Sequence, residues 1–71
     1  MPNPTHAYLG RLPCGCCVGV ITDLGDEGTA ESVAEFIRGG MYVERVTWDT
    51  YRFIAHNELT FMNCPHGGNN A

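Results

Sequence analysis

Residues 29–40 read TAESVAEFIRGG and contain the clearest helical pattern of the chain. Apolar side chains recur there at positions i, i+3, i+4 and i+7, the spacing of one buried helix face. The residues of this face are Ala30, Val33, Ala34 and Ile37. Thr29 is expected to cap the N-terminus, and Gly39 and Gly40 end the helix. Ile37 is expected to be among the most buried residues, with Phe36 at the edge of the face.

Two β-strands are predicted before this helix. Residues 7–12 (AYLGRL) alternate weakly, and residues 17–22 (CVGVIT) are short and rich in β-branched side chains. Between them lies the turn-forming sequence 13–16, which carries cysteines, so the two strands are expected to form a hairpin. Residues 23–28 (DLGDEG) are predicted to be an acidic loop.

After the helix, residues 41–46 (MYVERV) alternate as a half-buried strand does. Residues 47–57 fit either a short helix capped by Thr47 or a strand, and the helix is the interpretation chosen. Residues 59–62 (LTFM) are predicted to form a last short strand. The element order is therefore ββαβ(α)β. This order predicts an α+β fold in a single domain, with one main helix and the helices on one face of a small antiparallel sheet.

The chain has 71 residues, enough for one small domain. We expect an extended arm over residues 1–6, the domain over residues 7–66 and a flexible tail over residues 67–71. A domain of this size buries only about 60% of the surface that its unfolded chain exposes. An additional stabilising element is therefore expected, and the four cysteines are the obvious source.

Charge and composition exclude several functions. The net charge is −4, from four Lys plus Arg against eight Asp plus Glu, which disfavours nucleic acid as a partner. The sequence has neither a signal-peptide pattern nor an apolar run of about 20 residues, so a cytoplasmic protein that does not bind a membrane is expected. In a reducing compartment, metal binding by cysteines is favoured over disulfides.

The cysteines form two groups, CGCC at residues 14–17 and CPH at residues 64–66. Zinc takes four nitrogen or sulfur ligands, usually as two close pairs from separate segments. The predicted ligands of a structural zinc are Cys14, Cys16, Cys64 and His66. Gly67 occupies the position at which a second Cys-x-x-Cys pair would have its last cysteine.

Other assignments of the sulfurs stay open. Cys14 and Cys17 have the standard Cys-x-x-Cys spacing, so Cys17 is the alternative ligand. Consecutive strand residues point to opposite faces, so only one of Cys16 and Cys17 is expected to bind the metal. The thiols could instead be partly buried without a metal, or form a disulfide.

Four segments resemble small bacteriophage-type zinc-finger-like proteins, which carry an LPCGC turn and a C-terminal CPHC knuckle. The segments are LPCGC at 12–16, VAEFIRGG at 33–40, YVERV at 42–46 and CPH at 64–66. The resemblance spans residues 7–66 and implies a zinc-finger-like fold in a phage accessory protein, which would act in the host cytoplasm. It implies no activity, and Gly67 replaces the family's last cysteine.

Catalytic interpretations are disfavoured. The strand-like run after Cys17 offers no helix N-terminus to activate a redox cysteine. Ser32 is the sole serine and has no adjacent histidine, so a hydrolase triad is not expected. Asp26, Glu27 and Glu31 lack the alternating oxygen ligands of a calcium loop. His56 and His6 are expected at the surface and in the arm, outside any site.

Two functions remain. The first is a small non-catalytic, zinc-stabilised module that binds a protein partner. The alternative is an inhibitor of a host defence complex, of the CRISPR or nuclease type, that competes for a basic surface through its carboxylates. The oligomeric state is not indicated by the sequence.

Overall fold

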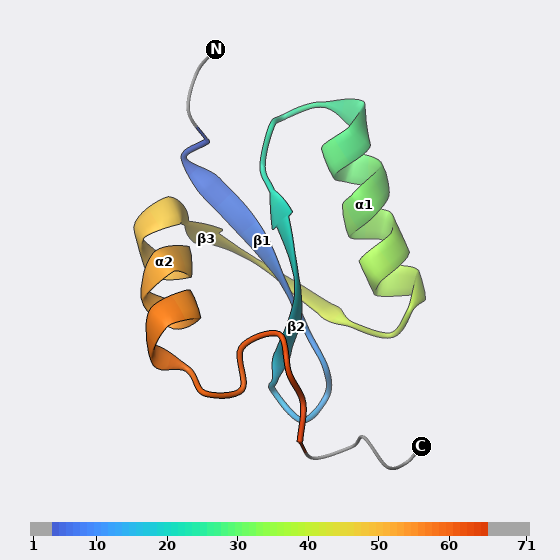
Figure 1. Ribbon diagram of the computed structural model, residues 1–71. Helices are drawn as coiled ribbons and strands as arrows, with labels where there is room; N and C mark the ends of the chain where they lie inside the picture. Colours follow the sequence, from blue (N-terminus) through green and yellow to red (C-terminus); the bar gives the residue numbers. More distant parts are fainter. Residues whose placement is uncertain (1–3, 66–71) are drawn as a thin grey trace.

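The computed structural model describes residues 4–65, which form a three-stranded sheet and two helices (Figure 1). The elements are β1 (His6–Arg11), β2 (Cys17–Thr22), α1 (Glu27–Arg38), β3 (Tyr42–Thr47) and α2 (Trp48–Asn57). The predicted α+β class with a small antiparallel sheet is confirmed. Because His6 already belongs to β1, the strand begins inside the expected arm. The expected tail at 67–71 lies outside the described residues.

The sheet has β1 at its centre, in the order β2-β1-β3. Both neighbours run antiparallel to β1, and Gly10 lies opposite Gly19 on β2 and Val43 on β3. The register of the β1–β2 pair shifts between Gly10 and Arg11, next to the turn of the hairpin. The cysteine-bearing turn therefore lies at a local irregularity of the ladder.

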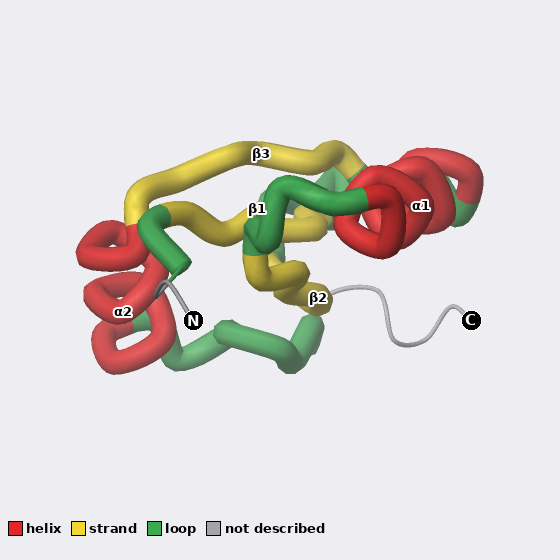
Figure 2. Tube along the Cα trace, turned by 90° about the horizontal axis from the view of Figure 1, so that it is seen from above, coloured by secondary structure: helices red, strands yellow, loops and turns green. Residues whose placement is uncertain are grey.

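The two helices cover opposite faces of this sheet, which corrects the expectation that they share one face. Leu9 of β1 packs in a cluster with Ile54 of α2. The next residue, Gly10, points to the other face, where the ring of Phe36 from α1 lies against it. Figure 2 shows the strands between the two helices. A six-residue strand at the centre of the sheet therefore supports both layers.

α1 begins earlier than predicted, because Asp26 rather than Thr29 is its N-cap. Asp26 Oδ1 accepts hydrogen bonds from the backbone N–H of Thr29 at 2.9 Å and from Thr29 Oγ1 at 3.0 Å. These hydrogen bonds, the backbone one first, hold the pKa of Asp26 below its usual value. A carboxylate at this end also complements the helix dipole. Thr29 is consequently a buried residue inside the helix.

The buried face of α1 also differs from the prediction. Ile37 is 58% exposed, and Ala30 is exposed as well. The face towards the sheet contains Thr29, Val33 and Phe36 instead, which is a rotation of about 100°, or one residue. The reason lies in the sheet: Gly10 and Gly19 are opposite one another and have no side chains, and Phe36 fills the space above them.

α2 follows β3 directly and is the short helix predicted for residues 47–57. Thr47 caps it as expected, because its Oγ1 accepts a hydrogen bond from the backbone N–H of Thr50 at 3.2 Å. Ile54 and Tyr51 face the core, whose fully buried side chains are Leu9 and Cys17. The main core therefore lies between β1, the start of β2 and α2.

The strand expected at residues 59–62 is not formed. This segment makes consecutive turns, with the N–H of Phe61 donating to Glu58 O at 3.2 Å and that of Asn63 to Thr60 O at 2.9 Å. Phe61 packs on the core beside Tyr51, with ring centroids 6.1 Å apart. The packing of Phe61 against the core holds this segment to the domain, although the segment pairs with no strand.

Among residues 4–65, neither helix is long and apolar enough to cross a bilayer.

Candidate metal centre

Three cysteine side chains meet at one end of the hairpin. Cys14 and Cys16 lie in the turn between β1 and β2, and Cys64 lies in the segment after α2. The three Sγ atoms are all within 4.8 Å of one another, and those of Cys14 and Cys64 are 3.4 Å apart. Figure 1 shows the segment after α2, in orange and red, returning to this end of β2. The fold thus gathers thiols that are up to 50 positions apart in sequence.

The turn is built so that its two cysteines point to the same place. The N–H of Gly15 donates to Leu12 O at 2.8 Å, and the N–H of Leu12 donates to Cys16 O at 2.9 Å. Gly15 adopts a φ of 98°, which L side chains rarely adopt, so a glycine is required between the two cysteines. The turn then places Cys16 in a buried position while Cys14 stays exposed.

The return of the last segment depends on two contacts. Phe61 packs against the core, and the N–H of Met62 donates to the carbonyl oxygen of Cys17 at 2.6 Å. Met62 has a φ of 61° and is the one non-glycine residue with a positive φ among residues 4–65. This left-handed residue turns the chain back towards the hairpin, two positions before Cys64.

The three thiols differ in their access to solvent. Cys16 is buried, Cys64 is partly buried and Cys14 is exposed. Burial raises the pKa of the Cys16 thiol to about 11, with hydrogen bonds to Cys14 and Cys64 adding to the shift. Without a metal, Cys16 is therefore protonated at neutral pH, and binding a metal there releases its proton.

Cys17 has a different environment, although it is adjacent to Cys16. Its side chain is fully buried in the core with Leu9, Val46 and Ile54. Its thiol donates to Gly19 O at 3.4 Å, and burial raises its pKa. Cys17 begins β2 and points into the core, whereas Cys16 is the last residue of the turn and belongs to the thiol cluster.

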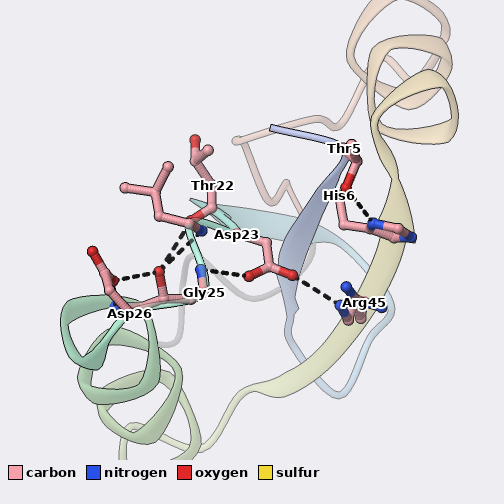
Figure 3. Close-up of polar contacts among 9 residues, drawn as sticks. Thr5, His6, Thr22, Asp23, Gly25, Asp26 and Arg45 are labelled. Atoms are coloured by element: carbon pink, nitrogen blue, oxygen red, sulfur yellow. Dashed lines mark hydrogen bonds and ion pairs between the residues drawn. The ribbon is translucent and has the colours of Figure 1, made fainter. Parts of the chain in front are cut away.

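The histidines contribute nothing further to the described part of the site. His66, predicted as the fourth ligand, lies outside the described residues. The Nδ1 of His6 lies 2.9 Å from Thr5 Oγ1, in a hydrogen bond at the start of β1 (Figure 3). His56 is exposed on α2. Within residues 4–65, the three cysteines are the sole group of metal-binding side chains gathered in this way.

The acidic loop before α1 is organised by its own hydrogen bonds, as Figure 3 shows. Asp23 Oδ1 accepts from the N–H of Gly25 at 3.1 Å, and its Oδ2 pairs with Arg45 Nε at 2.9 Å. Asp26 caps α1. These carboxylates therefore stabilise the loop and the start of the helix.

Three thiols in this arrangement suit a soft or borderline metal ion. In a tetrahedral zinc site with Zn–S bonds of about 2.3 Å, the sulfurs lie about 3.8 Å apart. The three Sγ atoms meet this requirement within about 1 Å, since one pair is at 3.4 Å and none exceeds 4.8 Å. The donor set and its spacing therefore fit zinc.

Comparisons with protein-family models, curated proteins and solved structures found no match. The resemblance to phage-type zinc-finger-like proteins consequently stays a prediction.

Proposed function

We propose that this chain is a small non-catalytic interaction module stabilised by one zinc ion. Cys14, Cys16 and Cys64 would bind the zinc, with His66 as the fourth ligand. The observation that supports this proposal best is the convergence of three Sγ atoms, from a hairpin turn and from a segment beyond α2, within 4.8 Å.

Hydrophobic packing does not account for this convergence. A thiol that packs as a small apolar group is expected in the core, as Cys17 is. Cys14 is exposed, and its Sγ nevertheless lies 3.4 Å from that of Cys64. None of the four cysteines forms a disulfide. Coordination of one metal ion would account for the proximity of the three thiols.

Bound zinc would supply a cross-link between the hairpin and the C-terminal segment. Structural zinc sites contribute an apparent binding free energy of about 10–16 kcal/mol, comparable with the whole stability of a small domain. The described contacts that hold the segment after α2 to the sheet include the packing of Phe61, a backbone hydrogen bond to Cys17 and the contact of Glu58 with Arg11. The metal would therefore strengthen the attachment of this segment to the hairpin.

The interaction role is supported by the surface. Several large apolar side chains are exposed, among them Tyr42 and Phe53, each 66% exposed, and Leu59, 99% exposed. The surface also carries a net charge of −4. Apolar side chains on an acidic surface favour a protein partner over nucleic acid. The alternative role as an inhibitor of a host defence complex stays a prediction from the sequence.

The metal is tested by native mass spectrometry of the chain purified without added chelator. One zinc per chain is expected, and cobalt(II) should replace it with the absorption of tetrahedral thiolate coordination. Cys14→Ala should abolish binding, whereas the matched variant Cys17→Ala should retain it. His66→Ala should weaken binding and change the cobalt spectrum. A wild-type chain that stays folded and binds neither ion would refute the proposal.

A further inference from the structure

Arg11 is the last residue of β1 and contacts three parts of the chain. Its Nη1 donates to the carbonyl oxygen of Gly15 at 2.8 Å, and its Nε lies 3.3 Å from Glu44 Oε1 on β3. Nη1 also lies 4.0 Å from Glu58 Oε1, immediately after α2. The side chain is only 23% exposed, so the guanidinium is held in one place.

Two of these three contacts involve segments that carry or lead to a cysteine. Gly15 separates Cys14 from Cys16, and its carbonyl belongs to the turn that orients both side chains. Glu58 begins the segment that leads to Cys64. Glu44 lies on β3, an edge strand of the sheet, and gives the guanidinium a third contact.

We propose that Arg11 is a positioning residue of the thiol cluster, holding the Gly15 turn and the Glu58 end of the returning segment in register. The inference rests on the proposed function, because a preorganised cluster matters most when a metal binds. A metal with three thiolates carries net negative charge, which the adjacent guanidinium also complements.

The arginine fork is essential to this role. A planar guanidinium can donate to a carbonyl oxygen and to a carboxylate at the same time, whereas a lysine ammonium on its flexible stem does not fix two partners in one plane. Arg11→Lys would preserve the charge and lose the geometry. Arg11→Gln would lose both, so the two variants separate electrostatics from positioning.

The test measures cobalt(II) affinity of the full chain by competition with a chelator. Arg11→Gln is expected to raise the dissociation constant about 10–100-fold, the usual effect of removing a group that orients metal ligands. Arg11→Lys should recover only part of this loss, and Glu44→Gln should cause a smaller one. Arg45→Gln is the matched control, because Arg45 also pairs with a carboxylate, that of Asp23 at 2.9 Å, but in the loop before α1.

A general structural role would give a different pattern. Partly exposed ion pairs contribute little to stability, so the metal-free unfolding midpoints of Arg11→Gln and Arg45→Gln should be similar. If Arg11→Gln lowered that midpoint strongly and left the cobalt affinity of the folded chain unchanged, the positioning role would be wrong. An unchanged affinity in Arg11→Gln at an unchanged midpoint would also overturn it.

A metal-free measurement keeps this inference separate from the proposed function. In a buffer of oxidised and reduced glutathione, Cys14 and Cys64 exchange with the glutathione disulfide to give one protein disulfide and two reduced glutathiones. Arg11→Gln should shift this equilibrium about tenfold towards the dithiol, while Arg45→Gln leaves it unchanged. If the wild-type chain bound no metal but Arg11→Gln still shifted this equilibrium, only the proposed function would fail. If the shift were absent, the positioning role would fail.

Discussion

The ring of Phe36 lies so close to Gly10 that a Cβ atom built on the glycine would be 2.6 Å from Phe36 Cδ2. Gly19, opposite Gly10 on β2, would have its Cβ 2.6 Å from Phe36 Cζ. One aromatic ring of α1 thus occupies the space of two missing side chains. This contact decides which side of the helix faces the sheet, and it makes the two glycines indispensable for packing rather than for a turn.

Gly10→Ala and Gly19→Ala are each expected to destabilise the protein by about 1–3 kcal/mol, the usual cost of overpacking. Replacing glycine by alanine inside a regular element ordinarily stabilises it by about 0.5–1 kcal/mol, so the sign here is informative. Gly28→Ala is the control within α1, where the nearest atom is 3.5 Å away. Urea unfolding of the three variants measures the difference, and a stabilising Gly10→Ala would show that Phe36 lies elsewhere.

Phe36→Ala should be far more damaging than Ile37→Ala. Removing the ring leaves a cavity above the two glycines, and we expect a loss of about 3 kcal/mol. Ile37 is 58% exposed, so its truncation should change the unfolding free energy by about 0.5 kcal/mol or less. Denaturant melts of the two single variants give the comparison. A larger effect of Ile37→Ala would mean that the face predicted from the helical pattern is the buried one.

Phe36 and Ile37 show which features of α1 can be predicted from the sequence and which cannot. The existence of α1, its C-terminal end and the capping of α2 by Thr47 follow from local signals, and all three were predictable. The orientation of α1 depends instead on Gly10 and Gly19, which come from two other elements and become neighbours only after β1 pairs with β2. The four-residue pattern around Ile37 contains no information about that space.

The members of the thiol cluster could be predicted from the sequence more readily than the orientation of α1. Alternation along a strand indicated that Cys16 and Cys17 have different roles, and the core position of Cys17 shows which one packs. The contacts of Arg11 were not predictable, because Glu44 and Glu58 are distant in sequence and one of them follows a helix whose end was uncertain. The failure of the strand at 59–62 has the same cause, since the anchor of Phe61 is a tertiary contact.

Met62→Gly should stabilise the protein by up to about 1 kcal/mol. A non-glycine residue at positive φ costs about 1–2 kcal/mol, and part of that gain is offset by the entropy that glycine loses on folding. Glycine keeps the N–H that donates to the carbonyl oxygen of Cys17. Met62→Ala retains the strain and is the control. Thermal melts in chelator compare the two variants, and a glycine variant less stable than the alanine one contradicts this explanation.

Asp26→Asn should lower stability at pH 7, and the difference from wild type should shrink as the pH falls below 3.8. The pKa of Asp26 is lower in the folded protein than its usual value of 3.8. The ionised form therefore stabilises the folded state, fully so above the unfolded pKa, and this contribution is lost as the pH falls through the lowered folded pKa. Urea midpoints of wild type and variant, measured from pH 7 down to pH 3, should approach one another as the pH falls. A constant difference would assign the effect to packing instead.

The effect of Cys17→Ala on stability should be the same with and without the metal, whereas the effect of Cys14→Ala should depend on the metal. Cys17 is fully buried, so Cys17→Ala should lower the unfolding free energy by about 1–3 kcal/mol both with zinc and with chelator. Cys14 is exposed, so Cys14→Ala should leave the chelated protein close to wild type. With zinc present, Cys14→Ala should lose the metal's contribution, which is about 4.1 kcal/mol at a free metal concentration 1,000 times the dissociation constant.

For each cysteine variant, unfolding curves of variant and wild type are measured with zinc and with chelator. These four curves separate a packing role from a ligand role. The wild-type difference between the two conditions measures the stabilisation by the metal, because only the folded chain gathers the three thiols. For Cys17→Ala that difference should equal the wild-type value, and for Cys14→Ala it should vanish. If both cysteine variants kept the full difference, Cys14 would not be a ligand. If Cys17→Ala removed the difference instead, the metal would bind the core thiol, and β2 would have to begin in another register.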